Sequence, residues 1–154
     1  MKIFDWIVLL IFDKELTTCE NQFGYEAGSS AMLCSWTAVE VINSFGTNGT
    51  PVFGCLLDFR KAFDLVNHVK MFQILIKRRV SLIFVKLMIV IYLQQRCYVR
   101  WNKSCSYSFS VTNGTRQGSV FSPKGGFGCY LDPLLKELKN MDAEFPIVGM
   151  ELLH

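Results

Sequence analysis

Apolar residues return every three to four positions over residues 31–45 and 61–79 of this 154-residue chain, which places them on one side of an α-helix and predicts a helix in each segment. Two further helices are predicted, over the apolar run 82–93 and over residues 127–139, which follow Gly125 and Gly126. Ser81 is a candidate N-cap for the third helix. Residues 80–93 are apolar on nearly all sides, which is typical of a helix in the core of a larger protein.

Short apolar runs and alternating patterns predict strands between these helices. Residues 52–57 form a run between the turn-rich residues 43–51 and Asp58, which indicates a buried strand with a carboxylate at its end. Residues 97–101 and 107–112 alternate in the manner of the two strands of a hairpin. The pattern as a whole predicts an α+β fold, and the length favours a single domain.

The composition excludes an intrinsically disordered chain, because 51% of the residues are hydrophobic and 19% are charged. The charge is unevenly distributed along the chain. Residues 51–130 carry twelve Lys and Arg against two Asp, a net charge of +10, whereas the segments before and after are acidic. This asymmetry favours a polyanionic partner such as nucleic acid, but a solvated helix face explains it equally well.

The cysteines and the apolar runs bear on the compartment. None of the six cysteines has C-x-x-C spacing, which argues against a zinc site, and they stand in apolar stretches as buried free thiols do. Asp5 interrupts the apolar residues 3–12, and residues 80–93 are too few to cross a bilayer. We therefore expect an intracellular protein, in the cytoplasm or nucleus, with no membrane and no disulfide partner. A small secreted or membrane-associated protein is the alternative.

Residues 56–68, LLDFRKAFDLVNH, hold the most informative polar cluster. A carboxylate at a strand end, here Asp58, is rigid enough to bind a hard cation. Arg60 and Lys61 would meet a triphosphate together with the metal, and Phe63 would wall the same cleft. The plainer interpretation is a strand–turn–helix junction in which Asp58 or Asp64 caps the helix.

Residues 113–123, NGTRQGSVFSP, form a second candidate segment. After a turn, Arg116, Gln117 and Gly118 offer a cation, an amide and a close backbone approach to a nucleotide. The plainer interpretation is a glycine-rich loop with a solvated arginine.

In this order the two segments resemble the reverse transcriptases of non-LTR (LINE-type) retrotransposons. DFRKAFDLVNH is similar to their first catalytic motif, in which K-A-F-D closely follows an Asp, and RQGSVFSP is similar to their palm motif R-Q-G-S-V-x-S-P. Residues 22–30, QFGYEAGSS, are similar to a finger segment of the same enzymes. The resemblance implies one partial reverse-transcriptase domain, with helices packed on a small antiparallel sheet. It assigns residues 1–50 to a finger-like segment, 51–140 to a palm-like segment and 141–154 to a remnant tail.

The resemblance also implies roles for individual residues. Asp58 would be the first of three carboxylates that hold two Mg²⁺ ions, and the Phe59 carbonyl would bind one of them; such metals activate the primer hydroxyl and neutralise the leaving pyrophosphate. Phe63 would be the steric gate that selects dNTPs. Gln117, flanked by Arg116 and Gly118, would line the site where the incoming nucleotide pairs with the template.

The implied partners are an RNA template, a DNA primer and a dNTP. Arg60 and Lys61 would bind the phosphates of the dNTP. Generic contacts to the nucleic-acid backbone, without sequence preference, would come from six further cations: Lys70, Lys77, Arg78, Arg79, Arg96 and Arg100.

The chain also departs from the family pattern. The family's next motif, Y/F-x-D-D, supplies the other two carboxylates, but no D-D stands anywhere in this sequence. Residues 130–133, YLDP, follow the R-Q-G segment too soon, and we exclude them as the catalytic pair. The finger segment of the family also contains a basic residue, whereas this chain has Glu26, Ala27 and Gly28 at that place. We therefore expect a reverse-transcriptase domain that is truncated before the Y/F-x-D-D hairpin of the family.

One carboxylate cannot fix two Mg²⁺ ions, because each demands near-octahedral coordination. The expected function is thus that of an RNA-directed DNA polymerase fragment, inactive by itself. The alternative is a non-catalytic nucleic-acid-binding module that uses the basic segment 60–124.

Overall fold

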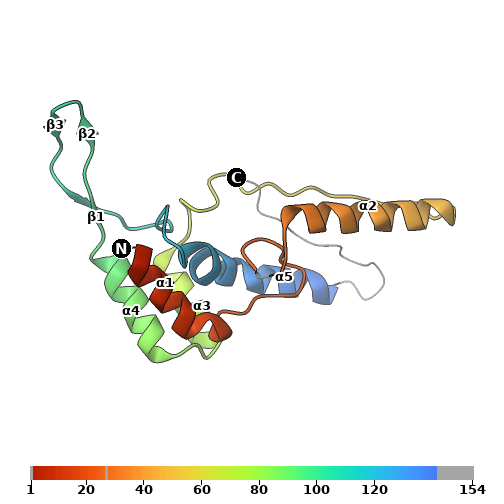
Figure 1. Cartoon of the computed structure of the whole chain (residues 1–154), viewed down its shortest axis with the longest axis horizontal. Helices are drawn as coiled ribbons and strands as arrows, with labels where there is room; N and C mark the ends of the chain where they lie inside the picture. The colour runs from red at the N-terminus through yellow and green to blue at the C-terminus, as the bar shows by residue number, and fades with distance from the viewer. Residues whose placement is uncertain (1, 27, 142–154) are drawn as a thin grey trace. The chain divides into compact units, whose positions relative to one another are not determined.

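The computed structural model describes residues 2–26 and 28–141. These residues belong to two compact units that alternate along the chain, unit 1 with Met1–Thr17 and Lys61–Tyr130 and unit 2 with Thr18–Arg60 and Leu131–His154. The described residues contain five α-helices and four short strands in antiparallel pairs (Figure 1). The predicted α+β class is confirmed.

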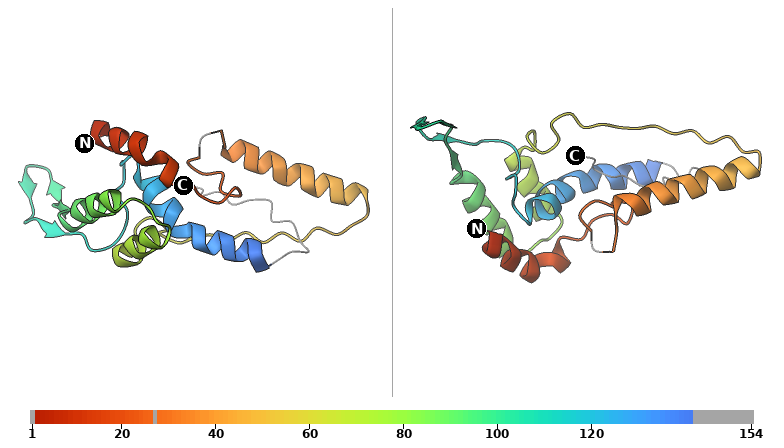
Figure 2. Two further views of the ribbon diagram at one scale, coloured as in Figure 1. Left: turned by 90° about the horizontal axis from the view of Figure 1, so that it is seen from below. Right: turned by 45° about the horizontal axis from the view of Figure 1, so that its top comes forward.

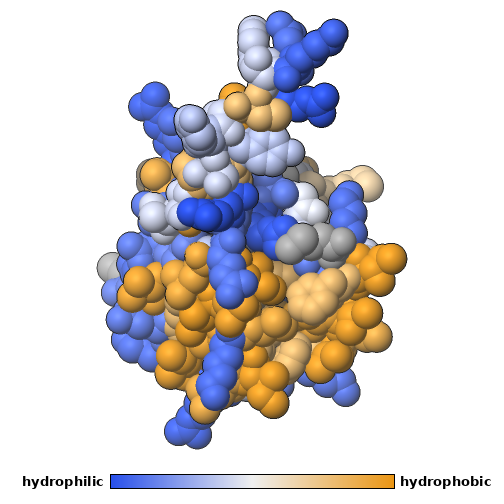
Figure 3. All heavy atoms as spheres, turned by 90° about the vertical axis from the view of Figure 1, so that its left-hand side faces the viewer, coloured by the Kyte–Doolittle hydropathy of each residue, from blue (hydrophilic) through white to orange (hydrophobic). Residues whose placement is uncertain are grey.

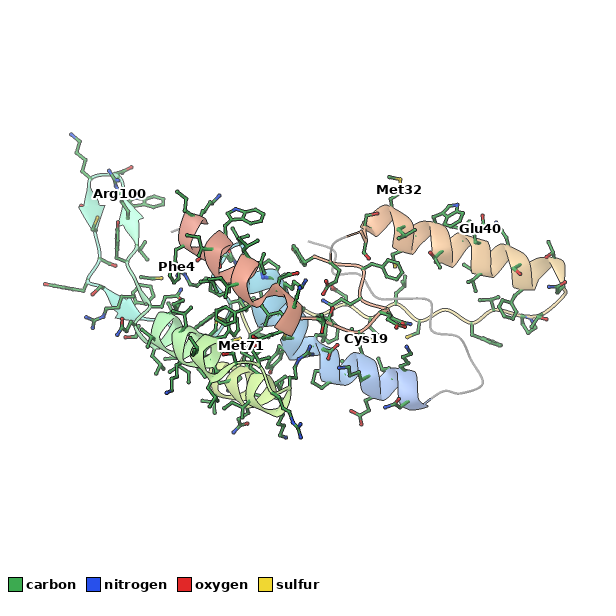
Figure 4. The ribbon with its side chains drawn as sticks, turned by 60° about the horizontal axis from the view of Figure 1, so that its bottom comes forward. Phe4, Cys19, Met32, Glu40, Met71 and Arg100 are labelled. Carbon is green, nitrogen blue, oxygen red and sulfur yellow. The ribbon has the colours of Figure 1, made fainter. Side chains whose placement is uncertain are left out.

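Three helices build the core of unit 1 (Figures 1 and 2): α1 (Lys2–Phe12), α3 (His68–Lys77) and α4 (Leu82–Leu93). Met71 and Leu75 of α3 are 0% exposed, as are Phe84 and Met88 of α4. Met71 lies among the three helices in Figure 4. The ring centroid of Phe12 lies 5.2 Å from that of Phe84, so the end of α1 packs against α4.

Two of the predicted helices form close to their predicted bounds. α4 confirms the prediction for residues 82–93, and α2 (Ala31–Thr47) confirms that for residues 31–45 with one extra half-turn. Ser30 caps α2, because its hydroxyl accepts a hydrogen bond of 3.1 Å from the backbone N–H of Leu33. Ser81 occupies the N-cap position of α4 without a side-chain capping bond.

The helix predicted over residues 61–79 is shorter at both ends. Residues 61–65 form turns instead, and Lys61 has a left-handed φ of 54° that no helix interior accepts. The side chain of Asn67 then accepts a 2.9 Å hydrogen bond from the backbone N–H of Lys70 and starts α3 at His68. At the other end, Arg79 has a φ of 59°, which stops the helix.

The predicted hairpin is confirmed, although its strands are only two residues long. Two antiparallel ladders lie one after the other along it: β1 (Arg96–Cys97) with β4 (Phe109–Ser110), and β2 (Arg100–Trp101) with β3 (Ser104–Cys105). Between the ladders, two residues on one strand face three on the other, which is a β-bulge. The Ser106 backbone N–H donates to the Val99 carbonyl across it, at 2.9 Å.

The strand predicted over residues 52–57 is wrong. Residues 51–59 have no regular hydrogen-bonded structure, all are exposed, and Leu56 is fully open to solvent. A buried strand needs neighbours for its backbone N–H and C=O groups, and the four described strands pair only with one another. An apolar run by itself therefore did not make a strand.

The last predicted helix, residues 127–139, is found as α5 (Cys129–Met141). A seven-residue π-helix, Ser122–Gly128, precedes it. A Cβ built on Gly126 would stand 3.2 Å from Thr115 Cγ2 and 3.4 Å from the Tyr92 hydroxyl, so the π-helix packs tightly because glycine stands there.

Unit 2 contains α2 and most of α5. Asp132 of α5 is 1% exposed and accepts a 2.6 Å hydrogen bond from the backbone N–H of Cys19. Its other oxygen pairs with Lys136 Nζ at 2.7 Å. Asp132, which belongs to the excluded YLDP segment, is thus a structural residue that fastens the segment after Thr18 to α5.

Two further observations concern the length of the helices and the cysteines. Among the described residues, no helix combines the length and the apolar character that a membrane span requires. All six cysteines are free thiols, and Cys19 and Cys129 are buried.

Candidate functional site

The two sequence motifs meet in unit 1. The backbone N–H of Thr115 donates to the carbonyl of Phe63 at 2.8 Å, and that of Gly114 donates to the carbonyl of Val66, also at 2.8 Å. Asn67 and Asn113 form an isolated antiparallel bridge beside them. Segments about fifty residues apart in the sequence are therefore joined through their backbones.

Gly114 allows this close approach. Its φ is 88°, and a Cβ built on it would stand 3.0 Å from the Asp64 carbonyl oxygen and 3.1 Å from the Asp64 Cα. The carbonyl of Gly114 also lies 2.7 Å from Nε2 of the buried His68. Glycine is required at this position for two reasons. Any other residue would be strained at this positive φ, and its Cβ would overlap the backbone of Asp64.

The side chains of the motifs also touch. Gln117 donates a hydrogen bond from Nε2 to Asp64 Oδ1 at 3.2 Å, and both residues are exposed. Gly118 has a φ of 77°, and a Cβ built on it would meet nothing within 4 Å. The R-Q-G turn therefore exposes an amide group and open backbone to solvent, beside the Asp64 carboxylate.

Phe63 is the apolar residue of this site. Its ring is half-buried, and its centroid lies 4.7 Å from that of Phe127 in the π-helix. Lys61 and Gln117 are exposed in the same unit, while Arg116 is half-exposed.

A buried tyrosine forms a hydrogen bond with the backbone of the R-Q-G turn. Tyr92 of α4 is 0% exposed, and its hydroxyl lies 3.2 Å from Ser122 Oγ and hydrogen-bonds the backbone of Arg116. Its ring meets that of His68 edge-on at a centroid distance of 4.8 Å. Burial raises the pKa of the Tyr92 phenol above the ordinary 10.0, and the two hydrogen bonds oppose this only in part.

We expect Tyr92 to make the protein less stable in alkali. Its proton is held more tightly in the folded chain than in the unfolded one, so the stabilisation is complete below about pH 10 and is lost as the pH rises through the folded pKa. Urea unfolding between about pH 8 and pH 12 measures the effect. In Tyr92→Phe the midpoint should fall less steeply above about pH 10. Parallel curves for the two proteins would contradict this assignment.

A buried aspartate of α1 also contacts the R-Q-G-S-V motif. Asp5, which interrupts the apolar run of the N-terminal segment, is 2% exposed, and its Oδ2 accepts a 3.3 Å hydrogen bond from the backbone N–H of Val120. It thereby fastens α1 to the end of the R-Q-G-S-V motif. In the sequence, Asp5 was noted only as an interruption of the apolar residues 3–12, and nothing there indicated its partner.

The residues predicted to bind Mg²⁺, Asp58 and Phe59, lie in unit 2. Asp58, Phe59 and Arg60 belong to unit 2 and are exposed in the segment without regular structure, so Asp58 does not stand at a strand end. Among the described residues, no three His, Cys, Asp or Glu gather into a group that would hold a metal ion. One carboxylate and one carbonyl do not meet the coordination that Mg²⁺ needs.

The predicted phosphate-binding cations differ in their surroundings. Lys77 and Arg79 are exposed at the end of α3, and Arg96 and Arg100 are exposed on the hairpin. Lys70 is also exposed, and its Nζ lies 5.7 Å from the centre of the Tyr130 ring. Arg78 is half-buried and donates a hydrogen bond to the Thr17 carbonyl, which gives it a structural role.

We compared the chain with models of protein families, with curated protein sequences and with solved structures, and none of them matches it.

Proposed function

We propose that this chain is the finger and palm portion of a reverse-transcriptase domain of the non-LTR retrotransposon type, and that its two motifs bind the incoming nucleotide. The motifs themselves, D-F-R-K-A-F-D and R-Q-G-S-V-F-S-P, carry the resemblance. The hydrogen bond between Gln117 and Asp64 is the observation that supports the proposal best. It joins, within unit 1, residues 61–64 of the first motif to the R-Q-G turn, and the resemblance assigns residues of both to one nucleotide site.

The chemistry of the exposed groups suits a nucleotide. The Gln117 amide can both donate and accept hydrogen bonds, as a base or sugar edge requires. The open backbone at Gly118 leaves room for a ligand to approach. Lys61 adds a flexible cation for phosphate oxygens. Phe63, held against Phe127, is the rigid ring that a steric gate against a ribose 2′-hydroxyl needs.

Catalysis is a separate question. Nucleotidyl transfer by this family depends on two metals, and the described residues do not supply the ligands for them. Asp58 and the Phe59 carbonyl remain the proposed donors on the strength of the resemblance alone. We therefore propose nucleotide binding without polymerase activity for this chain by itself.

Isothermal titration of the full chain with dATP and with ATP tests the nucleotide site. We expect dATP to bind more tightly than ATP, because the Phe63 ring would meet the 2′-hydroxyl. Gln117→Ala should weaken dATP binding by about 3- to 10-fold, since one hydrogen bond to the ligand is lost. Phe63→Leu, which keeps an apolar contact with Phe127, should bring the two affinities closer together.

Gln73→Ala is the matched control, because Gln73 is an exposed glutamine of α3 in the same unit. It should bind dATP as the unaltered chain does. The proposal fails if neither nucleotide binds, or if Gln117→Ala and Gln73→Ala have the same effect.

A second candidate function is nucleic-acid binding without any nucleotide site, through the basic segment 60–124. Five exposed cations favour it: Lys70, Lys77, Arg79, Arg96 and Arg100. The two candidates separate in the titration with dATP, because a module that binds only the nucleic-acid backbone would bind an oligonucleotide but not dATP.

A further inference from the structure

The hairpin of β1–β4 exposes an unusual set of aromatic side chains. Tyr98 is 62% exposed, Trp101 78%, Tyr107 97% and Phe109 49%, all within twelve consecutive residues. The hairpin stands away from the helices of unit 1 (Figures 1 and 2), and Figure 4 places Arg100 on it. No helix of this unit therefore covers these rings.

The strand register leaves the largest ring open. Trp101 lies opposite Ser104, and Arg100 lies opposite Cys105. Serine and cysteine are too small to cover a neighbouring indole or guanidinium group. The bulge beyond this ladder places one more residue on the strand that carries Tyr107, and Tyr98 and Tyr107 both lie in the bulge, outside the two ladders.

The charge of the hairpin has a single sign. Arg96, Arg100 and Lys103 are exposed, and the chain contains no acidic residue between Asp64 and Asp132. The remaining side chains are mostly small and polar, with Val99 the one exposed aliphatic residue of the hairpin. In Figure 3 the hairpin forms the blue and pale region at the top, above an orange apolar surface.

Cations interleaved with exposed aromatic rings are what a single-stranded nucleic acid requires. Its phosphates attract Arg and Lys, and its unpaired bases stack on aromatic faces without regard to sequence. A duplex would satisfy only the first of these, because its bases are already stacked on each other. A lipid surface would call for more aliphatic side chains than Val99 supplies.

We propose that the hairpin surface, formed by Tyr98, Trp101, Tyr107 and Phe109 with Arg96, Arg100 and Lys103, binds single-stranded nucleic acid by base stacking. The bases stack on the rings while the three cations bind the flanking phosphates. This surface is separate from the nucleotide site of Gln117 and does not depend on it. Both the hairpin surface and the proposed nucleotide site belong to unit 1.

Tryptophan fluorescence provides a direct test. The three tryptophans of the chain are Trp6, Trp36 and Trp101, so the variant Trp6→Phe/Trp36→Phe retains only the hairpin indole. We expect an oligo(U) strand of about 12 nucleotides to quench it. A strand of the same length without bases, and a duplex of the same length, should bind at least about 5-fold more weakly and leave the indole unquenched.

Substitution separates stacking from charge. Trp101→Ala should weaken binding of oligo(U) by about 5- to 100-fold. Trp6→Ala is the matched control, because Trp6 is an indole of the same unit that is 61% exposed on α1, and it should change nothing. Both side chains are on the surface, so both variants should fold as the unaltered chain does, which circular dichroism checks.

Four outcomes would overturn the proposal. They are equal affinity for the strand without bases, equal effects of Trp101→Ala and Trp6→Ala, an unquenched indole at saturation, and binding to anionic lipid vesicles in place of oligo(U). Gln117→Ala should leave oligo(U) binding unchanged, so failure of the nucleotide site and failure of the hairpin surface are distinguishable.

Discussion

Gly114→Ala is expected to lower the free energy of unfolding by about 3 kcal/mol, because a left-handed φ costs an alanine about 1–2 kcal/mol and the overlap of its Cβ with backbone atoms costs a similar amount. The overlapping atoms are the carbonyl oxygen and Cα of Asp64, at 3.0 and 3.1 Å. Neither is the end of a flexible side chain, so the two motifs would have to move apart. Urea unfolding of the full chain, followed by circular dichroism, measures the loss.

Gly118→Ala is the matched control. Gly118 has nearly the same φ, 77° against 88° for Gly114, but a Cβ there meets nothing within 4 Å. Only the cost of the left-handed conformation should appear, about 1–2 kcal/mol. If the two variants were equally unstable, the close contact between the motifs would not be what makes Gly114 necessary.

Asp132→Ala is expected to destabilise the chain by about 3 kcal/mol, since it leaves the backbone N–H of Cys19 without its acceptor in a buried position. The bond lost is 2.6 Å long, and Cys19 is 8% exposed. The ion pair with Lys136 disappears as well, but that lysine side chain is 56% exposed and contributes little. Urea unfolding followed by the fluorescence of Trp36, in the same unit, measures the effect.

Two further variants make the Asp132 result specific. Asp132→Asn keeps an oxygen that can accept from Cys19, so it should recover most of the stability that alanine loses. Glu137→Ala removes an exposed acid of the same helix and should cost less than about 0.5 kcal/mol. Equal losses in Asp132→Ala and Glu137→Ala would show that Asp132 acts only through the charge of α5.

The elements that were predictable from the sequence are those whose signals are local. The apolar spacing located α2, and the apolar run of residues 82–93 located α4. The alternation on either side of Asn102 located the hairpin, where Asn102 has the positive φ that a tight turn uses. In each of these, the hydrogen-bond partners lie within a few residues or directly across a turn.

The strand over residues 52–57 was not predictable because its existence depends on a partner strand elsewhere. An apolar run reports that a segment is suited to burial, and it does not report whether a neighbour is present to pair with it. The same reason explains why α3 begins later than expected. The periodicity extends back to Lys61, but the contacts of Phe63 and Val66 with residues 114–115 hold this segment as turns.

The candidate site was predictable as a pair of motifs but not as a set of contacts. The order of the two segments suggested that they belong together, and their residues Lys61, Phe63, Arg116 and Gln117 lie in one unit. Asp64 was considered only as a helix cap, and Tyr92 was not considered at all. A tyrosine within an apolar helix gives no sign that its hydroxyl meets Ser122 and the Arg116 backbone, because these partners are brought to it by the tertiary fold.

The two-residue ladders of the hairpin have a further consequence for solubility. Each ladder has only two strands, so each strand keeps an outer edge whose N–H and C=O groups are open to another chain. Arg96, Arg100 and Lys103 repel a second copy of the same edge, and they therefore protect the protein against aggregation in addition to any role in binding phosphate. Neutralising them would mix two effects, and the aromatic residues are for that reason the better positions at which to study recognition.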